Sequence, residues 1–119
     1  WGREALKQAL DQRKHGPFEF PFDVGNIILN KGYKVIPEFE VAGFSIDLVV
    51  QGENARLAVE CDGDQYHADW EADLKRENIL RRVGWKFWRV TGSAFYKHEE
   101  DALEPLWEKL KEMGIKPII

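Results

Sequence analysis

Apolar residues recur at helical spacing in two segments of the N-terminal part of this chain of 119 residues. Residues 1–15 carry alanines and leucines on one side of a predicted helix, and Gly16 with the proline after it should end that helix. A second helix is predicted to begin at Asp23, a favoured N-cap residue, and to end at Gly32. Both segments are therefore expected to be helical, and the second should lead directly into a sheet.

Runs rich in β-branched residues follow, and they predict three consecutive strands. The first covers 33–36 and should end at Pro37, which cannot donate to a strand ladder. The second covers 38–50, with Gly43 allowing a bend, and the third covers 57–61 as a nearly continuous apolar run. A polar turn separates the second run from the third, so we expect these two strands to pair as a hairpin.

The second half of the chain predicts a helix, a fourth strand and a final helix. The helix should end at Gly84, the alternation over 85–90 suits a strand, residues 91–93 predict a turn, and 98–113 form the last predicted helix. Pro105 should either kink that helix or mark its first turn. The residues expected to face the sheet from these two helices are Ala72, Ile79, Leu80, Val83, Leu103, Leu106, Leu110 and Met113.

Composition sets further bounds on the kind of protein. The chain has the length of one domain, and a hydrophobic content of 44% with five Trp and seven Phe is enough for a core. No apolar run approaches the ~20 residues of a membrane span, and the opening residues lack the apolar core of a secretory signal, so we expect a cytoplasmic protein without membrane contact. The single cysteine, Cys61, has no cysteine partner for a disulfide or a zinc site.

The net charge of −4 is unusual for a stand-alone nucleic-acid binder, but the distribution of charge is more informative. Acidic residues crowd the segment 62–73, and basic residues dominate 75–89 directly after it. An enzyme that cuts phosphodiesters needs carboxylates for a divalent metal and cations for the backbone phosphates. A solvated helix of ordinary mixed charge is the plain alternative for the basic segment.

Three acids stand where strands should be apolar, namely Asp47 in the second strand and Glu60 and Asp62 at the end of the third. If the two strands pair, these carboxylates converge at one end of the sheet, and such oxygen ligands favour a hard cation such as Mg²⁺, with Mn²⁺ as a substitute. Glu60 and Asp62 share one face of the strand because side chains alternate, whereas Cys61 points to the other face. A carboxylate that caps a neighbouring loop is the plain alternative for Asp47.

Phosphodiester hydrolysis needs an activated water, a charge-stabilising group for the transition state and a proton for the leaving oxygen. Asp47 and Asp62 are the expected metal ligands, and Glu60 is either a third ligand or a base that orients water. His67, a side chain with an ordinary pKa near ~6.5, can act as general base or donate to the phosphate. Packing beside its neighbouring tyrosine is the plain alternative for His67.

Several motifs in register resemble the PD-(D/E)XK, or restriction-endonuclease-like, superfamily. They are a PFE-type helix start, GYKVIPEFEVAGFSIDLVV, LAVECDGDQYH, an acid followed by an arginine in the next helix, and GWKFWRVTGSAFY. The closer resemblance is to the branch that contains the very-short-patch repair endonuclease and the nuclease-like domains at the C-terminus of superfamily I DNA helicases. The resemblance spans residues 18–113. It implies an α/β fold with an αβββαβ core, a mixed four-stranded central sheet flanked by helices, and extra N- and C-terminal helices.

The resemblance implies roles for individual residues. Asp47 matches the metal-bridging aspartate of the second core strand, and Glu60 matches the acid of the (D/E)XK element. The lysine position of that element falls on Asp62, so this chain has no cation of its own there. Relatives that lack the lysine use a histidine further along, which implies His67, with Gln65 near it, as catalytic residues.

Relatives also carry an acid on the helix before the first strand. That acid lies around Glu19 or Asp23 in this chain, although the register assigned from Gly32 places Pro21 there. Either Glu19 or Asp23 therefore substitutes for it, or a ligand of a second metal has been lost.

Basic residues of the helix and strand after the acidic segment are the expected contacts to DNA. They are Lys75, Arg76, Arg82 and Arg89. Arg89 has two interpretations, because it can reach a phosphate or the acids of the site, or it can form an ion pair with Asp73 or Glu77.

Together these features predict a Mg²⁺-dependent DNA endonuclease domain at 17–119, preceded by a helical connector at 1–16. The chain begins with Trp rather than Met, which favours a module of a larger protein with a helicase or ATPase domain. Duplex cutting in the superfamily commonly needs two active sites, so a monomer would nick and a homodimer would cut both strands. An inactive nuclease-like module that binds DNA or a partner protein is the main alternative, and a metal-dependent phosphatase-like hydrolase is a third.

Overall fold

The computed structural model of the protein describes residues 19–62 and 70–118. The predicted helix over 1–15 and the domain boundary between 16 and 17 lie outside the described residues. The described elements are α2 (Glu19–Asn30), β1 (Lys34–Val41), β2 (Phe44–Gln51), β3 (Arg56–Asp62), α3 (Trp70–Arg82), β4 (Lys86–Thr91), α4 (Gly92–Lys97) and α5 (Glu99–Glu112). Their order confirms the predicted helix, three strands, helix, strand and helix, with one short helix added before the last.

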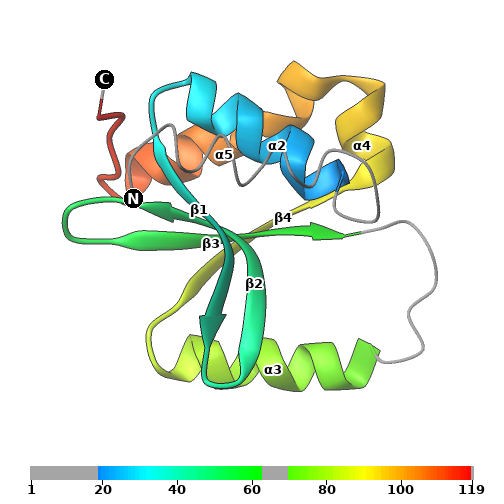
Figure 1. The fold of residues 1–119 in the computed structure, drawn as a ribbon, viewed down its shortest axis with the longest axis vertical. Helices are drawn as coiled ribbons and strands as arrows, with labels where there is room; N and C mark the ends of the chain where they lie inside the picture. Colours follow the sequence, from blue (N-terminus) through cyan, green and yellow to red (C-terminus); the bar gives the residue numbers. More distant parts are fainter. Residues whose placement is uncertain (1–18, 63–69, 119) are drawn as a thin grey trace.

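The four strands form one mixed sheet in the order β1-β2-β3-β4 (Figure 1). β1 with β2 and β2 with β3 are antiparallel pairs, whereas β3 and β4 run parallel. A parallel pair needs a crossover connection, and α3 supplies it by crossing one face of the sheet between β3 and β4. The predicted third and fourth strands match β3 and β4 to within one residue at each end. The predicted α/β fold class with a mixed four-stranded sheet is therefore confirmed.

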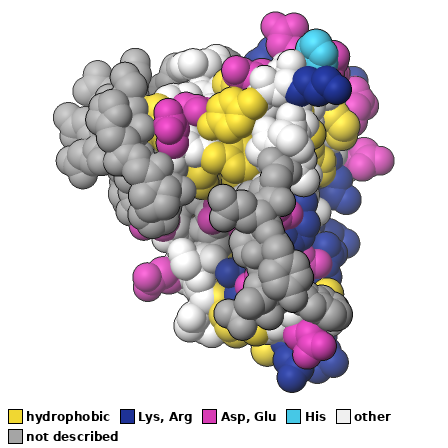
Figure 2. All heavy atoms as spheres, turned by 90° about the vertical axis from the view of Figure 1, so that its right-hand side faces the viewer, with side chains coloured by type: hydrophobic (Ala, Val, Ile, Leu, Met, Phe, Trp, Pro, Cys, Tyr) yellow, Lys and Arg dark blue, Asp and Glu magenta, His cyan; other side chains and the backbone are white. Residues whose placement is uncertain are grey.

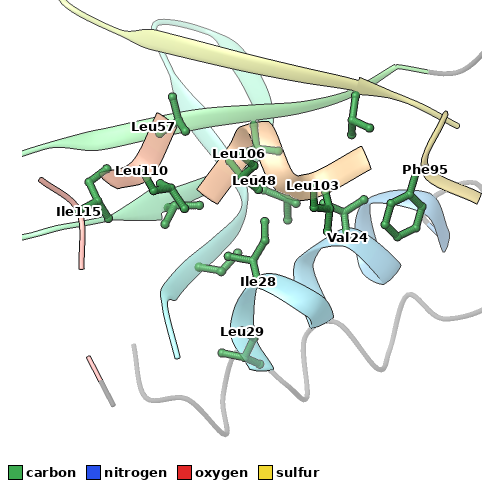
Figure 3. Close-up of a cluster of buried hydrophobic side chains, with 14 of the residues drawn as sticks. Val24, Ile28, Leu29, Leu48, Leu57, Phe95, Leu103, Leu106, Leu110 and Ile115 are labelled. Carbon is green, nitrogen blue, oxygen red and sulfur yellow. The ribbon is translucent and has the colours of Figure 1, made fainter. Parts of the chain in front are cut away.

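Helices cover both faces of this sheet, with α2, α4 and α5 on one face and α3 on the other (Figure 1). The larger core lies under α2 and α5, where Ile28 and Leu48 are fully buried (Figure 3). Leu103, Leu106 and Leu110 form the predicted apolar stripe of α5. Burying each such side chain contributes roughly 1.5–3 kcal/mol, so this core holds the two helices on the sheet. None of the described helices is long or apolar enough to span a membrane.

The prediction that Ala72, Ile79, Leu80 and Val83 face the sheet is wrong except for Leu80. Leu80 is fully buried in a second, smaller core beside Trp85. Ile79 and Val83 are 46% and 72% exposed, and Ala72 is exposed as well. The face of α3 that meets the sheet is partly charged instead, because it contacts acidic and basic side chains of β3 and β4. Apolar spacing therefore could not indicate which side of α3 faces inward.

Helix α2 begins at Glu19, a full turn before the predicted N-cap, so the prediction for Asp23 is wrong. Pro21 lies in the first turn, where the missing N–H group would have no intrahelical acceptor. Asp23 instead accepts a hydrogen bond from the Tyr96 hydroxyl at 2.6 Å. The helix ends where predicted, because Gly32 has a positive φ of 97°, which favours glycine.

The chain reverses between β1 and β2 at Ala42 and Gly43, so the predicted break at Pro37 and the single long second strand are wrong. Both turn residues have a positive φ, 52° and 79°, as the two-residue turns of tight hairpins require. Pro37 lies inside β1, which is an edge strand, and an edge tolerates the missing N–H group. Gly43 therefore belongs to a hairpin turn rather than to a bend within one strand.

A short helix, α4, replaces the predicted turn over 91–93. Thr91 is its N-cap, and the Thr91 hydroxyl oxygen accepts a hydrogen bond from the Ala94 N–H group at 3.3 Å. The helix after it extends over the predicted range, and Pro105 lies within it rather than in its first turn.

Candidate active site

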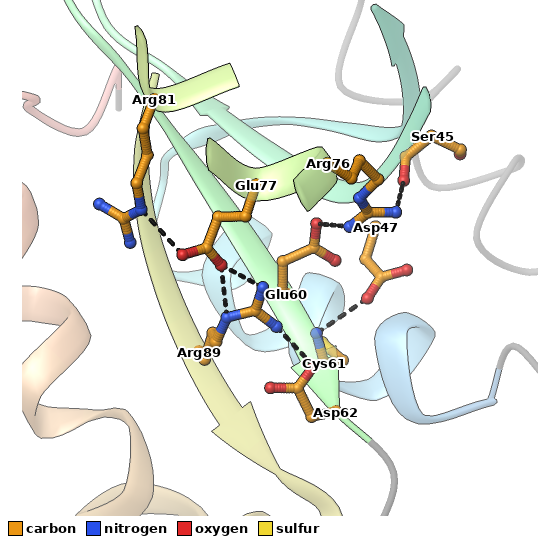
Figure 4. Close-up of polar contacts among 9 residues, drawn as sticks. All are labelled: Ser45, Asp47, Glu60, Cys61, Asp62, Arg76, Glu77, Arg81 and Arg89. Atoms are coloured by element: carbon orange, nitrogen blue, oxygen red, sulfur yellow. Dashed lines mark hydrogen bonds and ion pairs between the residues drawn. The ribbon is translucent and has the colours of Figure 1, made fainter. Parts of the chain in front are cut away.

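Asp47 lies where the ladder between β2 and β3 ends. The last described pair of this ladder is Leu48 with Val59, and the same register places Asp47 across from Glu60. The Asp47 Oδ2 atom accepts a hydrogen bond from the Cys61 N–H group at 2.9 Å (Figure 4). The side-chain carboxylate thus takes the place of a ladder acceptor and is held against the end of β3.

Glu60 is a buried acid with an exposed fraction of only 4%. Its side chain points toward α3, where Arg76 Nη2 forms an ion pair with Glu60 Oε1 at 2.6 Å (Figure 4). The Arg76 Nη1 atom donates to the Ser45 carbonyl oxygen at 3.2 Å, and its Nε–H group is buried without an acceptor among the described residues. Arg76 therefore ties α3 to the ends of β2 and β3.

The pKa of Glu60 is raised from the ordinary 4.5 to about 8. Burial is the largest cause, and the negative charge of Asp47 and hydrogen bonding to its carboxylate raise the pKa further. Arg76 and Arg89 lower the pKa but do not offset these effects. Glu60 therefore keeps its proton at neutral pH unless a metal ion takes the place of that proton.

Asp62, the third predicted acid, is bound to an arginine of β4. Arg89 Nη1 lies 2.8 Å from Asp62 Oδ1, and the same guanidinium donates to Glu77 of α3 through Nε at 2.9 Å and through Nη2. Arg81 Nε donates to the second carboxylate oxygen of Glu77 at 2.8 Å. A chain of alternating acids and arginines thus runs from the end of β3 to α3 (Figure 4).

The charges of Glu77 and Arg89 stabilise each other in this network of acids and arginines. Burial pushes the pKa of Glu77 upward, but hydrogen bonds from Arg81 and Arg89 outweigh it and leave that pKa lowered. Burial pushes the pKa of Arg89 downward, but the hydrogen bond to Glu77 and the charge of Asp62 outweigh it and leave that pKa raised. Of the two predicted partners of Arg89 on α3, Glu77 is bound to it and Asp73 is exposed.

Sequence reasoning missed Arg81 and treated Glu77 only as a partner in an ion pair. The signal for both residues was their spacing, because an acid four positions before an arginine lies on the same helix face. Neither spacing nor composition could show that this pair also meets the fourth strand.

Within residues 19–62 and 70–118, no three His, Cys, Asp or Glu side chains are arranged to hold a metal ion. Glu60 and Asp62 each form an ion pair with an arginine of a neighbouring element. The predicted three-carboxylate metal site therefore stays a prediction. What the structure does bring together is the pair Asp47 and Glu60.

The two acids of α2 have different surroundings. Glu19 is exposed in the first turn, whereas the carboxylate of Asp23 accepts the hydrogen bond from Tyr96 of α4. Burial is the largest cause that raises the pKa of the Tyr96 hydroxyl, and Asp23, Glu19 and Cys61 add to it. Asp23 is therefore committed to α4, and Glu19 is the acid of this helix that remains open to solvent.

The remaining predicted site residues divide into two groups. Gln65 and His67 lie outside the described residues. Of the predicted DNA contacts, Lys75 and Arg82 are exposed on α3. Arg76 and Arg89 form ion pairs with Glu60 and Asp62 instead. Figure 2 shows Lys and Arg side chains along one side of the molecule with Asp and Glu side chains between them. Positive and negative side chains are therefore interleaved along this side of the molecule.

A mixed sheet with this helix order, and with carboxylates where the ladder between its second and third strands ends, is the architecture of a restriction-endonuclease-like, nuclease-type domain. Comparison with family models agrees, because the model described as REase_MTES_1575, a restriction-endonuclease-like family, matches residues 20–110. The chain belongs to this family, which supports the predicted PD-(D/E)XK-like superfamily and implies DNA as the substrate. No curated protein and no solved structure shows a significant match to the chain.

Proposed function

We propose that this domain is a divalent-metal-dependent endodeoxyribonuclease that hydrolyses phosphodiester bonds in DNA. The observation that carries the proposal is the pair of carboxylates formed by the half-buried Asp47 and the buried Glu60, in which the pKa of Glu60 is raised to about 8. A carboxylate buried beside a second carboxylate costs free energy unless a cation compensates the charge. A site that binds a divalent cation gives a reason for keeping both acids.

The donor set of this pair fits Mg²⁺. Both side chains offer carboxylate oxygens, and Mg²⁺ is often bound by one or two carboxylates while it keeps several waters and binds substrate phosphates. Asp47 and Glu60 would hold the ion, with Mn²⁺ as a substitute, and Asp62 would join them only by leaving Arg89. When bound, the metal supplies positive charge at the scissile phosphate and lowers the pKa of a coordinated water.

The reaction adds water across one P–O bond of the DNA backbone. The water oxygen bonds to phosphorus, the bond to one deoxyribose oxygen breaks, and that oxygen receives a proton. We assign His67 as the base that takes the proton of the water, with Gln65 orienting the water. Arg76 holds Glu60 in place through their ion pair.

Residues around the pair would bind and orient the substrate. Lys75 and Arg82, both exposed on α3, are the proposed contacts to the phosphate backbone, and such contacts weaken as salt increases. Glu19, exposed at the start of α2, is the proposed acid of that helix in the active site.

The wider context is also part of the proposal. The motifs over residues 18–113 support membership of the branch that contains the very-short-patch repair endonuclease and helicase-attached nuclease domains. The domain would then act in the cytoplasm as a module of a larger protein with a helicase or ATPase domain. It would nick DNA as a monomer and cut both strands as a homodimer.

One observation favours a second candidate function, an inactive nuclease-like module that binds DNA or a partner protein. Asp62 occupies the lysine position, and the ion pairs with Arg76 and Arg89 compensate Glu60 and Asp62 without a metal. A domain retained only for binding could keep this network without cutting DNA.

A plasmid-nicking assay separates the two candidates. With Mg²⁺, the wild-type protein should convert supercoiled plasmid to the nicked form, and Asp47→Ala should lower the rate by about 100-fold because one of the two metal-binding carboxylates is lost. Asp101→Ala, on the exposed side of α5, removes an acid on the opposite face of the sheet from α3 and should nick at the wild-type rate.

Two results would reject the proposal. Nicking by Asp47→Ala at the wild-type rate would show that the carboxylate pair takes no part in catalysis. Absence of nicking by the folded wild-type protein, together with retained DNA binding, would favour the inactive module.

A further inference from the structure

Arg89 brings a positive charge to the strand end where the (D/E)XK element of this chain has an acid. Asp62 occupies the lysine position of that element, and Arg89 Nη1 lies 2.8 Å from Asp62 Oδ1. In the parallel register Arg89 pairs with Glu60, and its charge is one of the two that lower the pKa of Glu60. The guanidinium on β4 is therefore within electrostatic reach of the carboxylate pair.

We propose that Arg89 is the catalytic cation of this site, in place of the lysine that the strand end lacks, and that Glu77, itself bound by Arg81, is a positioning residue that orients Arg89 toward the scissile phosphate. This inference rests on the proposed nuclease function. It assigns roles to two side chains, Glu77 and Arg81, that lie outside the acid motif.

The chemistry of the guanidinium suits a phosphate ligand. Arginine carries five N–H groups in a planar fork, and the contacts to Asp62 and Glu77 involve Nε, Nη1 and Nη2. Each Nη atom has two N–H groups and uses one of them in these contacts. One N–H group on Nη1 and one on Nη2 therefore make no hydrogen bond to the described residues. Such a fork matches the oxygens of a phosphate. The side chain of Arg89 is 37% exposed, so a DNA phosphate can reach it.

Glu77 is the fixed part of the arrangement. Its side chain is only 12% exposed, and one of its oxygens accepts from two nitrogens of Arg89 while the other accepts from Arg81. Asp62 makes a single contact with Arg89 and is itself 37% exposed. A phosphate can therefore replace Asp62 at Nη1 while Glu77 keeps the guanidinium in place.

A purely structural role for Arg89, compensating Asp62, is the competing explanation. Steady-state nicking kinetics distinguish the two, because a structural contact affects folding whereas a transition-state contact affects kcat. The variants are Arg89→Met, Arg89→Lys and Glu77→Gln, with Lys111→Met on the exposed side of α5 as the control for loss of a surface cation. Circular dichroism establishes the folding of each variant, and calorimetric titration measures its affinity for Mg²⁺.

Arg89→Met should lower kcat by about 100-fold, the typical effect of removing one donor to a transition state, with Mg²⁺ affinity within about twofold of wild type. Arg89→Lys should recover about tenfold of that loss, because it restores a cation without the planar fork. Glu77→Gln should lower kcat by about tenfold and leave KM unchanged, because it loosens the guanidinium without removing its charge.

An unchanged kcat in Arg89→Met, in a wild-type background that nicks, would overturn this inference and leave the proposed function intact. A loss of Mg²⁺ affinity in Arg89→Met as large as its loss of kcat would likewise assign Arg89 a structural role. If Arg89→Met does not fold, Glu77→Gln decides, and a wild-type kcat in that variant overturns the inference. An inactive wild-type protein would instead refute the proposed function, and this inference with it.

Discussion

Glu60 is the residue at which burial and charge oppose each other most strongly. It is buried in the sheet, Asp47 lies close enough to raise its pKa, and Arg76 is the one arginine in ion-pair contact with it among the described residues. A single guanidinium cannot neutralise two carboxylates, so the pair retains negative charge that a proton or a metal ion can compensate. The arrangement that destabilises the metal-free protein at high pH is thus the one that would bind a divalent cation.

The raised pKa of Glu60 predicts that the metal-free protein loses stability as the pH rises. The unfolded chain releases this proton near the ordinary pKa of 4.5, whereas the folded protein keeps it up to about pH 8, so the folded state binds the additional proton between these limits. The contribution to stability is therefore complete below the lower value and is lost as the pH rises through the upper one. Thermal unfolding in EDTA between about pH 5 and about pH 9 measures it.

The matched control for this prediction is Glu60→Gln, which cannot ionise and should remove most of the slope. Mg²⁺ should also flatten the wild-type slope, because the metal takes the place of the proton. Equal slopes for wild type and Glu60→Gln in EDTA would contradict the assigned pKa.

At the scale of elements, strands β3 and β4 were predictable because their apolar and alternating patterns are local. The boundary between β1 and β2 was not predictable in the same way, because Pro37 is a stronger local signal for the end of a strand than Ala42 and Gly43 are for a turn. A proline ends a central strand but is tolerated at an edge, and the edge position of β1 is a property of the whole sheet.

The inward face of α3 was hidden from the sequence for a reason connected with the site. Arg76, Glu77 and Leu80 face the sheet, so only one of these three positions is apolar. Apolar periodicity assumes a hydrophobic core under the helix, and here a charged cluster takes part of that place. The acids could be predicted because carboxylates are rare in apolar strands, but the arginines that bind Glu60 and Asp62 lie 16 and 27 residues away in sequence.

The short helix α4 depends on its N-cap. Thr91→Ala should destabilise the protein by about 1 kcal/mol, because the Ala94 N–H group loses the hydroxyl that accepts its hydrogen bond. Thr91→Ser keeps the hydroxyl and should stay close to wild type. Urea unfolding of the three proteins measures the difference, and equal stability of the alanine and serine variants would show that the cap contributes nothing.

At the scale of the whole molecule, the order of the strands assembles the site. β3, which carries Glu60 and Asp62, lies between β2 with Asp47 and β4 with Arg89. The crossover through α3 then brings the arginine that binds Glu60 onto the same face of the sheet (Figure 4). Three adjacent strands and one helix therefore supply the carboxylate pair and the arginines that surround it, while the opposite face of the sheet builds the larger core.

Calorimetric titration with Mg²⁺ measures whether Asp47 and Glu60 form a site for a divalent metal ion. The wild-type protein should give a saturable binding curve near neutral pH, and Asp47→Ala should bind at least about tenfold more weakly, because one of the two carboxylate ligands is lost. Asp101→Ala should bind as the wild type does. A folded wild-type protein that gives no binding heat with Mg²⁺ or Mn²⁺, or an Asp47→Ala variant that binds as tightly as wild type, would show that this pair of acids is not a metal site.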